Sequence, residues 1–598
     1  MGRKRVALAR LKAPALFRGR PALPRANAVI PASDAGTMEG AFGSAERRHI
    51  ATLGTWLRNP AVICLAAAVA ASGAILVTLG SHLIFYWDAW NMVLERSGLS
   101  AGVFLDPHHQ HLLVAVVVIY KLLLATFGMS SPLPFHAAST LIYLLAAVLL
   151  FVYARRRVGD WLALLGTALI LFFGVASYDL LLPFQMFFSG AIAAGIGALL
   201  ALDHDDRRGD VVACGLLVVS TSFSEVGIAF TVGAVVHMAL ARRPFARRSY
   251  VALLPLVLYG LWWLGWGHTG HSYLSLQNVV ATPAYVFDAV ATAMGALLAI
   301  ISSGNHAPAT VDQRWAQFLP IVAVGLAAWR VRRLGGVPRG VWPVLAVGLT
   351  FWVLAGFNQD ASRGPDNSRY LYPSAVFILL IASGLLRGLR LSNRAMVAAT
   401  AATAIAVTAN LVFLSDDYRL YWTPKSQESQ AELRALEIAG RVNPAYVLTT
   451  RTAGLIHIGV GSYLSAVDAW GSPAYTASEL RASPESQRLK ADRVLATILG
   501  LKLAPVGSAA APCRTVRASP SGVTGLKLAP GRVTIGASGS TKVKVLLGRF
   551  SDQLPVDAGS LGRRSRASLT IPTDRSTHPW RLGLKGDGPV KLCGAGLT

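Results

Sequence analysis

Residues 61–90 read AVICLAAAVAASGAILVTLGSHLIFYWDAW, a long apolar run that ends in a carboxylate, Asp88, set among aromatic rings. About 20 consecutive apolar residues suffice to cross the hydrocarbon core of a bilayer as a helix. The run therefore predicts a membrane span over 61–85. Because an ionisable group at membrane depth is costly and usually marks a functional site, we expect Asp88 to do chemistry, or to bind a polar molecule, at the lipid–water boundary. The alternative is that Asp88 caps a helix or pairs with an arginine.

The whole chain has the composition of a polytopic membrane protein. Of its 598 residues, 53% are hydrophobic and 14% are charged, whereas about 25% are charged in a soluble domain. The 56 Lys and Arg against 30 Asp and Glu give a net charge of +26. Much of this excess lies in short clusters between apolar runs, as the positive-inside rule predicts. We therefore expect contact with membrane lipids and no nucleic-acid partner.

Similar apolar runs recur along the first two thirds of the chain and predict 11 to 13 membrane helices in all. The segments are 61–85, 110–128, 134–154, 161–177, 184–203, 211–223, 225–241, 249–266, 284–303, 316–330, 341–357, 371–387 and 395–414. The stretch 211–241 reads as two half-length helices broken at 222–225. The segment 284–303 reads either as a span or as a re-entrant or surface helix.

Arginine clusters between these runs set the expected orientation in a plasma membrane. The positive-inside rule places the clusters on the cytoplasmic side; they lie at 155–157, 207–208, 242–248, 330–339 and 387–394. The N-terminus is then cytoplasmic, and the outer face carries the loops at 86–109, 178–179, 267–315 and 358–370 and the C-terminal tail. Two spans between Asp88 and Arg155 would contradict this, so either one of those segments lies in the interface or the Arg155 cluster departs from the rule.

The composition divides the chain into four parts. We expect a disordered basic cytoplasmic arm (1–59), a membrane domain (60–415), an extracytoplasmic mixed helical region (416–510) and a small β-sandwich (511–598). The last part alternates short Val, Leu and Thr runs with Gly, Pro and Ser, which is typical of a sandwich. If this part is extracellular, Cys513 and Cys593, which bracket it, are well placed to form a disulfide between its first and last strands.

Histidines and a second acidic turn follow Asp88 along the predicted outer face. His108, His109 and His111 enter the second apolar run, and imidazoles can bind a metal or donate to a phosphate near neutral pH. They are either substrate-binding groups or a polar cap on that span. Asp179 either completes a divalent-cation site with Asp88, since carboxylates suit hard cations such as Mg²⁺, or caps the next helix.

Four further residues are candidates for substrate binding. Glu225 lies in an apolar hairpin, so it is either paired or faces a polar cavity. Arg363, Arg369 and Tyr370 precede a span. An arginine suits bidentate phosphate binding, and such a group can hold a lipid phosphate while the tail runs between helices; the alternative is interfacial anchoring.

Two other polar motifs carry less weight. His268 and His271 open a long outer loop and are weaker candidates, since surface histidines are common. Asp203-His204-Asp205-Asp206 contains a DxD pattern, which in soluble glycosyltransferases holds a metal and a nucleotide. A three-residue match is weak, and the segment sits beside two arginines, so we interpret it as a solvated turn.

These features together resemble the GT-C superfamily of integral-membrane glycosyltransferases, which use polyprenyl-phosphate sugars. The resemblance rests on Trp87-Asp88 in the first outer loop, the His-rich segment 107–111, the turn Tyr178-Asp179, the many spans and the outer C-terminal part, and it covers about 61–415. The segment 107–111 departs from the superfamily in having Gln110 where an acid is common. The Ala, Arg and Gly bias with the β-rich tail is similar to actinobacterial cell-envelope enzymes of this class.

The resemblance implies that Asp88 is the catalytic or metal-associated carboxylate and Asp179 a second acid of the site, with Mg²⁺ or Mn²⁺ as the divalent ion. It also implies that Arg363 or Arg369 contacts the donor phosphate, that the acceptor is an envelope glycan, lipid or protein, and that the tail is a carbohydrate-binding module.

Two alternatives come from other functional classes. A transporter or flippase requires polar residues near the bilayer midplane, often in broken helices, and Glu225 with the short helices of 211–241 points that way. An inert scaffold whose tail binds wall polymer predicts that Asp88 and Asp179 lie far apart.

Overall fold

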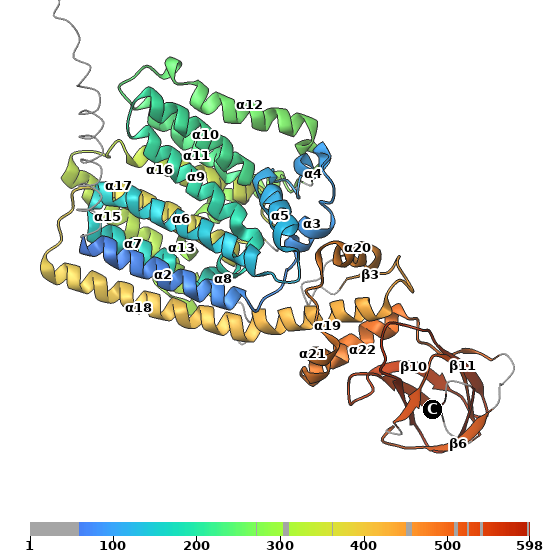
Figure 1. Cartoon of the computed structure of the whole chain (residues 1–598). Coiled ribbons are helices and arrows are strands. Elements are labelled where there is room, and N and C mark those ends of the chain that lie inside the picture. The colour runs from blue at the N-terminus through green and yellow to red at the C-terminus, as the bar shows by residue number, and fades with distance from the viewer. Residues whose placement is uncertain are drawn as a thin grey trace, which may run out of the picture. The chain divides into compact units, whose positions relative to one another are not determined.

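The computed structural model describes residues 59–598 apart from 271, 303–309, 312, 361–362, 450–456, 507–511, 523–524, 539–541, 595–596 and 598. It is mostly helical, with a strand-rich C-terminal part (Figure 1). The basic arm predicted over residues 1–59 lies outside the described residues, except for Asn59, and so does His271.

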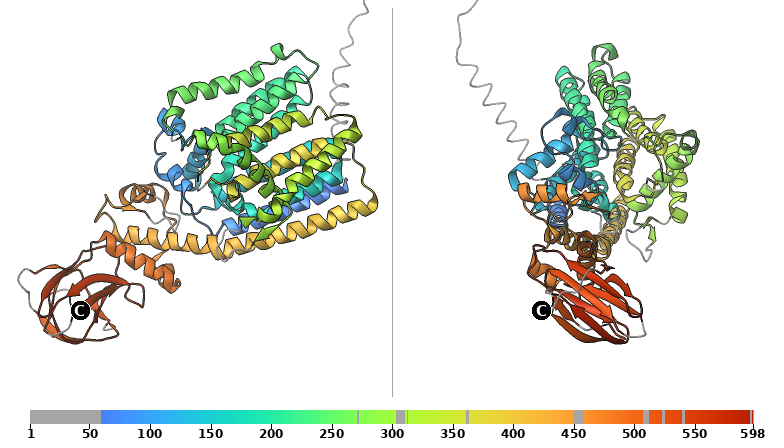
Figure 2. Two further views of the ribbon diagram at one scale, coloured as in Figure 1. Left: turned by 180° about the vertical axis from the view of Figure 1, so that it is seen from behind. Right: turned by 90° about the vertical axis from the view of Figure 1, so that its right-hand side faces the viewer.

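Long helices packed side by side form the first part of the described chain (Figures 1 and 2). They are α2 (Pro60–Gly80), α6 (Leu133–Val158), α7 (Asp160–Leu171), α9 (Met186–Leu202), α10 (Arg207–Phe223), α11 (Val226–Ala239), α12 (Tyr250–Gly265), α13 (Leu276–Leu297), α15 (Phe318–Leu334), α16 (Val341–Phe357), α17 (Ser368–Leu385) and α18 (Asn393–Asp417). Helix α9 lies at the centre of the bundle. In the apolar segment Pro183–Leu202 that contains it, 89% of the residues are buried, against 22% in α2.

The helices confirm a multi-pass membrane protein. Seven segments of the described chain are long and apolar enough to cross a bilayer, and four further apolar helices are shorter. The long set includes Leu276–Leu297, which favours a span over a surface helix for the segment predicted at 284–303. With the four shorter helices, the apolar segments of the described chain reach the lower end of the predicted 11 to 13.

The short helix α5 (Val114–Phe127) resolves the conflict over the Arg155 cluster. Its 14 residues extend about 21 Å, which is less than the roughly 30 Å of the hydrocarbon core. It packs on α3 (Asp88–Leu94) and α4 (Ala101–Leu105) at one end of the bundle (Figure 1). Only α6 then crosses between the first loop and Arg155, which places Asp88 and Arg155 at opposite ends of the bundle.

The arginine clusters do gather at that second end. Arg157 Nη2 lies 3.2 Å from Asp203 Oδ2. The backbone carbonyl of Arg157 accepts a hydrogen bond from the Gly388 N–H at 3.2 Å. Arg330 Nη2 donates to the Arg387 carbonyl at 2.8 Å. The clusters from four loops therefore share one face, as the positive-inside pattern predicts.

The acids of the DxD pattern are part of this arginine-rich face. Besides Asp203, Asp205 Oδ1 accepts a hydrogen bond from Arg248 Nη1 at 2.7 Å. The segment forms the turn between α9 and α10, and Asp206 caps α10 by accepting from the Gly209 N–H. These contacts favour the interpretation of the segment as a turn over a metal–nucleotide motif.

The predicted break within 211–241 is present. Helices α10 and α11 pack against each other and are interrupted at Ser224 and Glu225. A Cβ on Gly227 would lie 2.3 Å from the Thr221 backbone nitrogen, so only glycine permits this close approach of the two helices. The break leaves the Glu225 side chain at a helix start rather than inside a continuous span.

Helix α18 does not end at the predicted boundary of 415. It continues through a π-helical turn (Tyr418–Trp422) into α19 (Thr423–Ala439), giving one 47-residue segment, Asn393–Ala439 (Figure 1). The junction is tied to the bundle, because Ser177 Oγ donates to Asp417 Oδ2 at 2.7 Å and accepts from Trp422 Nε1 at 3.2 Å. Helices α20 (Val460–Trp470), α21 (Ala477–Ala482) and α22 (Glu485–Ile498) follow.

Two antiparallel sheets form the C-terminal part and confirm the predicted β-sandwich. The five-stranded sheet has the order β5-β11-β8-β13-β6 and the four-stranded sheet the order β10-β9-β12-β7. The strands are β5 (Ala504–Pro505), β6 (Cys513–Ala518), β7 (Leu526–Leu528), β8 (Gly531–Ala537), β9 (Val543–Gly548), β10 (Val556–Leu561), β11 (Arg566–Ile571), β12 (Trp580–Lys585) and β13 (Gly588–Cys593). Alternate residues such as Val533, Val545 and Leu582 are fully buried between the sheets.

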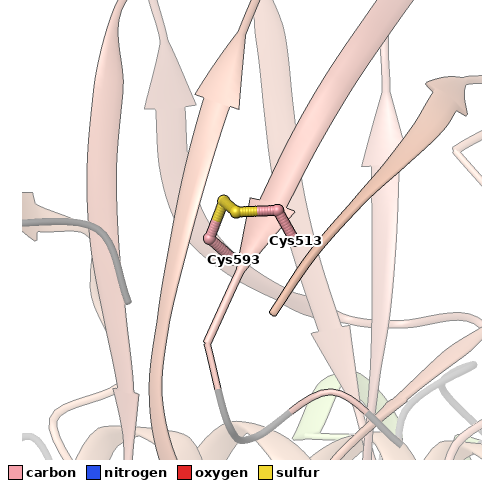
Figure 3. Close-up of a disulfide and its surroundings, with 2 residues drawn as sticks. All are labelled: Cys513 and Cys593. Atoms are coloured by element: carbon pink, nitrogen blue, oxygen red, sulfur yellow. A yellow bond between two sulfur atoms is a disulfide. The ribbon is translucent and has the colours of Figure 1, made fainter. Parts of the chain in front are cut away.

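The predicted disulfide between Cys513 and Cys593 is present (Figure 3). It links β6 to β13, which are neighbouring strands in which Cys593 lies directly opposite Cys513. The bridge therefore pins the edge strand β6 to the sheet. It also spans 80 residues of sequence, so it joins the two ends of the sandwich.

Candidate active site

A cavity of about 690 Å³ opens beside α3. Its walls come from α3 and the residues that flank it, from residues 107–111, the turn before α9, the start of α11, the end of α16 and the start of α17. Eight of the nine predicted site residues line it: Asp88, His108, His109, His111, Glu225, Arg363, Arg369 and Tyr370. Asp179 does not, although its neighbour Tyr178 does.

Asp88 is held at the cavity wall as the first residue of α3. The residue before it, Trp87, has a φ of +46°, a left-handed conformation that costs free energy for a bulky side chain and is often found at functional sites. Trp87 stacks on Tyr86, with ring centroids 5.7 Å apart. This turn ends the connection from α2 and directs the Asp88 carboxylate to the cavity.

The histidines reach Asp88 because residues 108–111 form a tight turn. The His108 N–H donates to the His111 carbonyl at 3.2 Å, and the His111 N–H donates back at 3.0 Å, with His109 at a φ of +56°. His108 Nε2 lies 3.3 Å and His109 Nε2 3.9 Å from Asp88 Oδ1. The turn thus brings two of the three histidines to Asp88.

The electrostatics of this group favour a charged Asp88 and a neutral His108. Burial by itself raises the pKa of Asp88, but the nearby imidazoles of His108 and His109 outweigh this effect and hold the pKa well below the ordinary value. Burial lowers the pKa of His108, and Asp88 only partly offsets this. Asp88 is therefore an anion at neutral pH.

His111 and Glu225 form a second pair on another wall. The two side chains are 114 residues apart in sequence, and His111 Nδ1 hydrogen-bonds Glu225 Oε2. Glu225 is brought there by the break between α10 and α11. The pairing is the alternative predicted for an acid in an apolar hairpin, and it occurs at the edge of a polar cavity.

Arg363, Arg369 and Tyr370 come from the loop before α17 and from its first turn. Arg363 Cζ lies 4.5 Å from the centre of the Tyr273 ring, and its Nε lies 3.8 Å from Asp360 Oδ2. Arg369 Cζ lies 5.2 Å from the centre of the Tyr370 ring. Asn367 caps α17 by accepting from the Arg369 N–H. Two guanidinium groups thus line the same cavity as Asp88, on aromatic supports.

Asp179 lies in the short helix α8 (Ser177–Leu181) and is only 4% exposed. Its two carboxylate oxygens receive no hydrogen bond from another described residue. Arg369 supplies the opposite charge that acts on it. The structure therefore connects Asp179 to the cavity through Arg369 and does not place it among the residues that could share a metal ion with Asp88.

The described residues that could hold a metal ion together are Asp88, His108 and His109, whose donor atoms all lie within 4.8 Å of one another. His108 Nε2 is buried and, despite its 3.3 Å approach to Asp88, makes no well-aligned hydrogen bond. One carboxylate and two imidazoles suit borderline metals such as Zn²⁺ or Mn²⁺ better than Mg²⁺, which prefers oxygen ligands. The set fits a metal, and it differs from the predicted pair of Asp88 and Asp179.

Several residues that line the cavity carry no signal that sequence alone could use. Tyr259, Tyr273 and His457 approach from segments far from the first loop. Trp87 and Tyr178 lie next to predicted acids, and their aromatic character at an outer turn is the one feature that could have identified them. The positions of Tyr259, Tyr273 and His457 depend on helix packing, which hydropathy does not encode.

Comparisons with known proteins give matches to solved structures only. No protein-family model and no curated protein matches the chain. Two crystal structures of ArnT from Cupriavidus metallidurans are similar in structure: the apo state (TM-score 0.44, 14% identity, 75% of this chain and 97% of that one) and a complex with undecaprenyl phosphate (TM-score 0.42, 13% identity, 67% and 84%). At this level of similarity, we assign no residue role and no activity to this protein from these two structures.

Proposed function

We propose that this protein is a membrane glycosyltransferase that moves a sugar from a polyprenyl-phosphate donor to a cell-envelope glycan, lipid or protein on the outer face of the membrane. The observation that carries the proposal is that an ionised carboxylate and two arginines line one cavity at one end of a membrane-helix bundle. The carboxylate suits activation of a hydroxyl, and the arginines suit binding of a phosphate. The sequence resemblance to the GT-C superfamily points to the same reaction.

In the proposed reaction Asp88 accepts the proton of an acceptor hydroxyl as its oxygen attacks the anomeric carbon of the donor sugar. The new bond joins that oxygen to the anomeric carbon, and the bond from this carbon to the phosphate oxygen breaks. Polyprenyl phosphate leaves with the electron pair. The imidazoles of His108 and His109, which lie 3.3 and 3.9 Å from Asp88 Oδ1, keep this carboxylate ionised.

Arg363 and Arg369 stabilise the negative charge that develops on the departing phosphate. Their guanidinium groups are positioned by Tyr273 and Tyr370. The wall beside them is aromatic and apolar, with Phe187, Phe188 and Phe351 among its members. Such a wall suits the first isoprene units of a lipid carrier, whose apolar chain gains by leaving water.

A divalent ion bound by Asp88, His108 and His109 would supply Lewis-acid stabilisation of phosphate oxygens. The chain's own groups still perform orientation, proton transfer and phosphate binding. A metal would compete with a proton for Asp88, so metal dependence and the pH profile of the reaction report on the same carboxylate.

The transporter alternative has one observation in its favour, the broken pair α10 and α11 with Glu225 at the break. However, the cavity is lined mainly by loops and helix ends, whereas alternating access calls for a site near the midplane. The scaffold alternative predicts that Asp88 and Asp179 are apart, and Asp179 indeed lies off the cavity. A transfer assay therefore decides between these alternatives and the proposal.

The assay gives purified protein in detergent radiolabelled polyprenyl-phosphate sugars and envelope acceptors. Asp88→Asn is compared with Asp106→Asn, a change of the same kind in the same loop at a residue that does not line the cavity. Transfer by the wild type and Asp106→Asn, lost in Asp88→Asn, supports the proposal. Absence of transfer from every donor by folded wild-type protein would favour the transporter or the scaffold.

A further inference from the structure

The five-stranded sheet of the β-sandwich has an unusual distribution of charge. Its strands β5, β6, β8, β11 and β13 contain no acidic residue. They contain five cations: Arg514, Arg517, Arg532, Arg566 and Lys591. All five side chains are exposed. The sheet therefore presents a positive surface that its own strands do not neutralise.

The strand register places four of these cations on one face. Arg566 lies opposite Gly536, and Gly536 lies opposite Lys591 on the next strand, so both side chains point the same way. Arg532 lies four residues from Gly536 on the same strand, so its side chain points to the same face. Arg517 pairs with Pro589, which is two residues from Lys591, so its side chain points to that face too. This outer face, defined by Arg517, Arg532, Arg566 and Lys591, points away from the core residues Val533, Ile535 and Leu592.

The four-stranded sheet lacks this character because acids accompany its cations. Lys544 Nζ lies 2.9 Å from Asp557 Oδ2, and Arg581 lies 3.8 Å from Asp552. On the outer face, Arg517 Nη2 lies 3.9 Å from Asp587 Oδ1, and both side chains are largely exposed. Such an exposed pair contributes little free energy and leaves Arg517 able to exchange partners.

The residues between the cations decide what kind of anion fits. Residues 511–598 contain two large aromatic residues, Phe550 and Trp580, and both are buried. The sandwich therefore has no aromatic platform of the kind that stacks on the apolar faces of neutral sugars. An amphipathic membrane surface would likewise need exposed apolar or aromatic side chains beside its cations, whereas Thr515, Gly536 and Thr570 fill the spaces here.

The disulfide limits where this surface works. Cys513 and Cys593 are bonded within the same sheet, and disulfides persist in oxidising compartments outside the cytoplasm. Polyanions in that setting are envelope polysaccharides that carry carboxylate or phosphodiester groups, rather than nucleic acids. A rigid sheet bearing cations about 10 Å apart across alternate strands matches charges repeated along such a chain.

We propose that the outer face of the five-stranded sheet binds an anionic polysaccharide through Arg517, Arg532, Arg566 and Lys591. Binding depends on charge and hydrogen bonding rather than on ring stacking. It is a property of the sandwich and does not require the transfer reaction proposed above. It replaces the general expectation of a carbohydrate-binding tail with a defined surface and a defined ligand chemistry.

The test measures binding of full-length protein in detergent to polygalacturonate, to poly(glycerol phosphate) and to neutral dextran of similar length. The variant Arg566→Gln/Lys591→Gln is compared with Lys527→Gln/Lys585→Gln, which removes the same charge from exposed positions of the other sheet. Thermal unfolding shows that both are folded. We expect the first variant to weaken binding of a polyanion at least tenfold and the second by less than twofold, with no binding of dextran by any protein.

Three results would overturn the proposal. Equal weakening by both variants would mean that net charge alone attracts the polymer. Binding of dextran as tight as that of the polyanions would mean recognition of neutral sugar. Loss of binding to phosphatidylglycerol vesicles in the first variant, without any polyanion binding by the wild type, would identify a membrane-contacting surface instead. Which polyanion binds more tightly distinguishes carboxylate from phosphodiester chemistry.

Discussion

His108 Nε2 lies 3.3 Å from Asp88 Oδ1, and both side chains face one cavity at the end of the helix bundle. The contact joins the turn before α3 to the turn before α5, so the position of the carboxylate depends on the histidine. Burial keeps His108 neutral, while the nearby imidazoles keep Asp88 ionised. The pair thus presents a charged carboxylate to the cavity.

Replacing His108 by Ala should lower kcat about 10- to 100-fold and change KM little, because it removes a group that orients the base and does not hold the substrate. Steady-state kinetics with a polyprenyl-phosphate sugar measure both constants. The matched control is His268→Ala, an exposed histidine off the cavity. A rise in KM at unchanged kcat would instead assign His108 to substrate binding.

Chelation tests the metal cluster. If Asp88, His108 and His109 hold an ion, dialysis against a chelator should reduce activity, and Zn²⁺ or Mn²⁺ should restore it better than Mg²⁺, because two of the three donors are imidazoles. Metal content of the purified protein is measured in parallel. Full activity in protein that contains no metal would exclude the ion and leave the histidines as neighbours that keep Asp88 ionised.

We expect Arg369 to bind the donor phosphate through its planar guanidinium group. Arg369→Gln is expected to lower kcat/KM about 100-fold, roughly 2.7 kcal/mol of transition-state stabilisation. Arg369→Lys keeps the charge but loses the bidentate geometry and should recover only part of the activity. Competition by undecaprenyl phosphate gives an independent reading of phosphate affinity. Unchanged inhibition in both variants would move Arg369 from the phosphate to a structural role beside Asp179.

Asp492 links the stability of the C-terminal part to pH. Burial raises its pKa to about 6, against backbone N–H groups of Arg549, Phe550 and Ser551 that oppose the rise. The ordinary pKa of an aspartate is about 3.9, so the folded state binds this proton more tightly than the unfolded chain. The contribution of this proton to the free energy of unfolding is complete below about pH 4 and is lost as the pH rises through 6. It amounts to roughly 3 kcal/mol.

Hydrogen exchange of the strand amides near Arg549, measured from pH 4 to 7.5 and corrected for intrinsic rates, follows this change. Asp492→Asn should remove the pH dependence. The control is Asp557→Asn, since Asp557 is exposed and its pKa is lowered rather than raised. An equal pH slope in wild type and Asp492→Asn would show that another group is responsible.

The sequence predicts much of this architecture where the signal is local. The break at Ser224 and Glu225 follows from polar residues inside an apolar run, and the sandwich from alternating strands. The Cys513–Cys593 pair follows from its bracketing position. These features depend on a few neighbouring residues, so periodicity and composition suffice.

Features that depend on packing escaped prediction. Hydropathy leaves open which segment between Asp88 and Arg155 fails to cross, and it does not show that α18 continues beyond residue 415. It gives no sign that His111 meets Glu225 across 114 residues or that His457 reaches the cavity. The burial of Asp179 behind Arg369 is likewise a product of how α8 packs. Long-range contacts of this kind are set by the assembled bundle.

The most direct test of the central claim is sugar transfer by Asp88→Asn beside wild type and Asp106→Asn, in protein shown to be folded. We predict that Asp88→Asn retains folding and donor binding but transfers label at least 1,000-fold more slowly (about 4 kcal/mol), whereas Asp106→Asn matches the wild type. Transfer by Asp88→Asn at the wild-type rate would contradict the assignment of Asp88 as the base and, with it, the proposed active site.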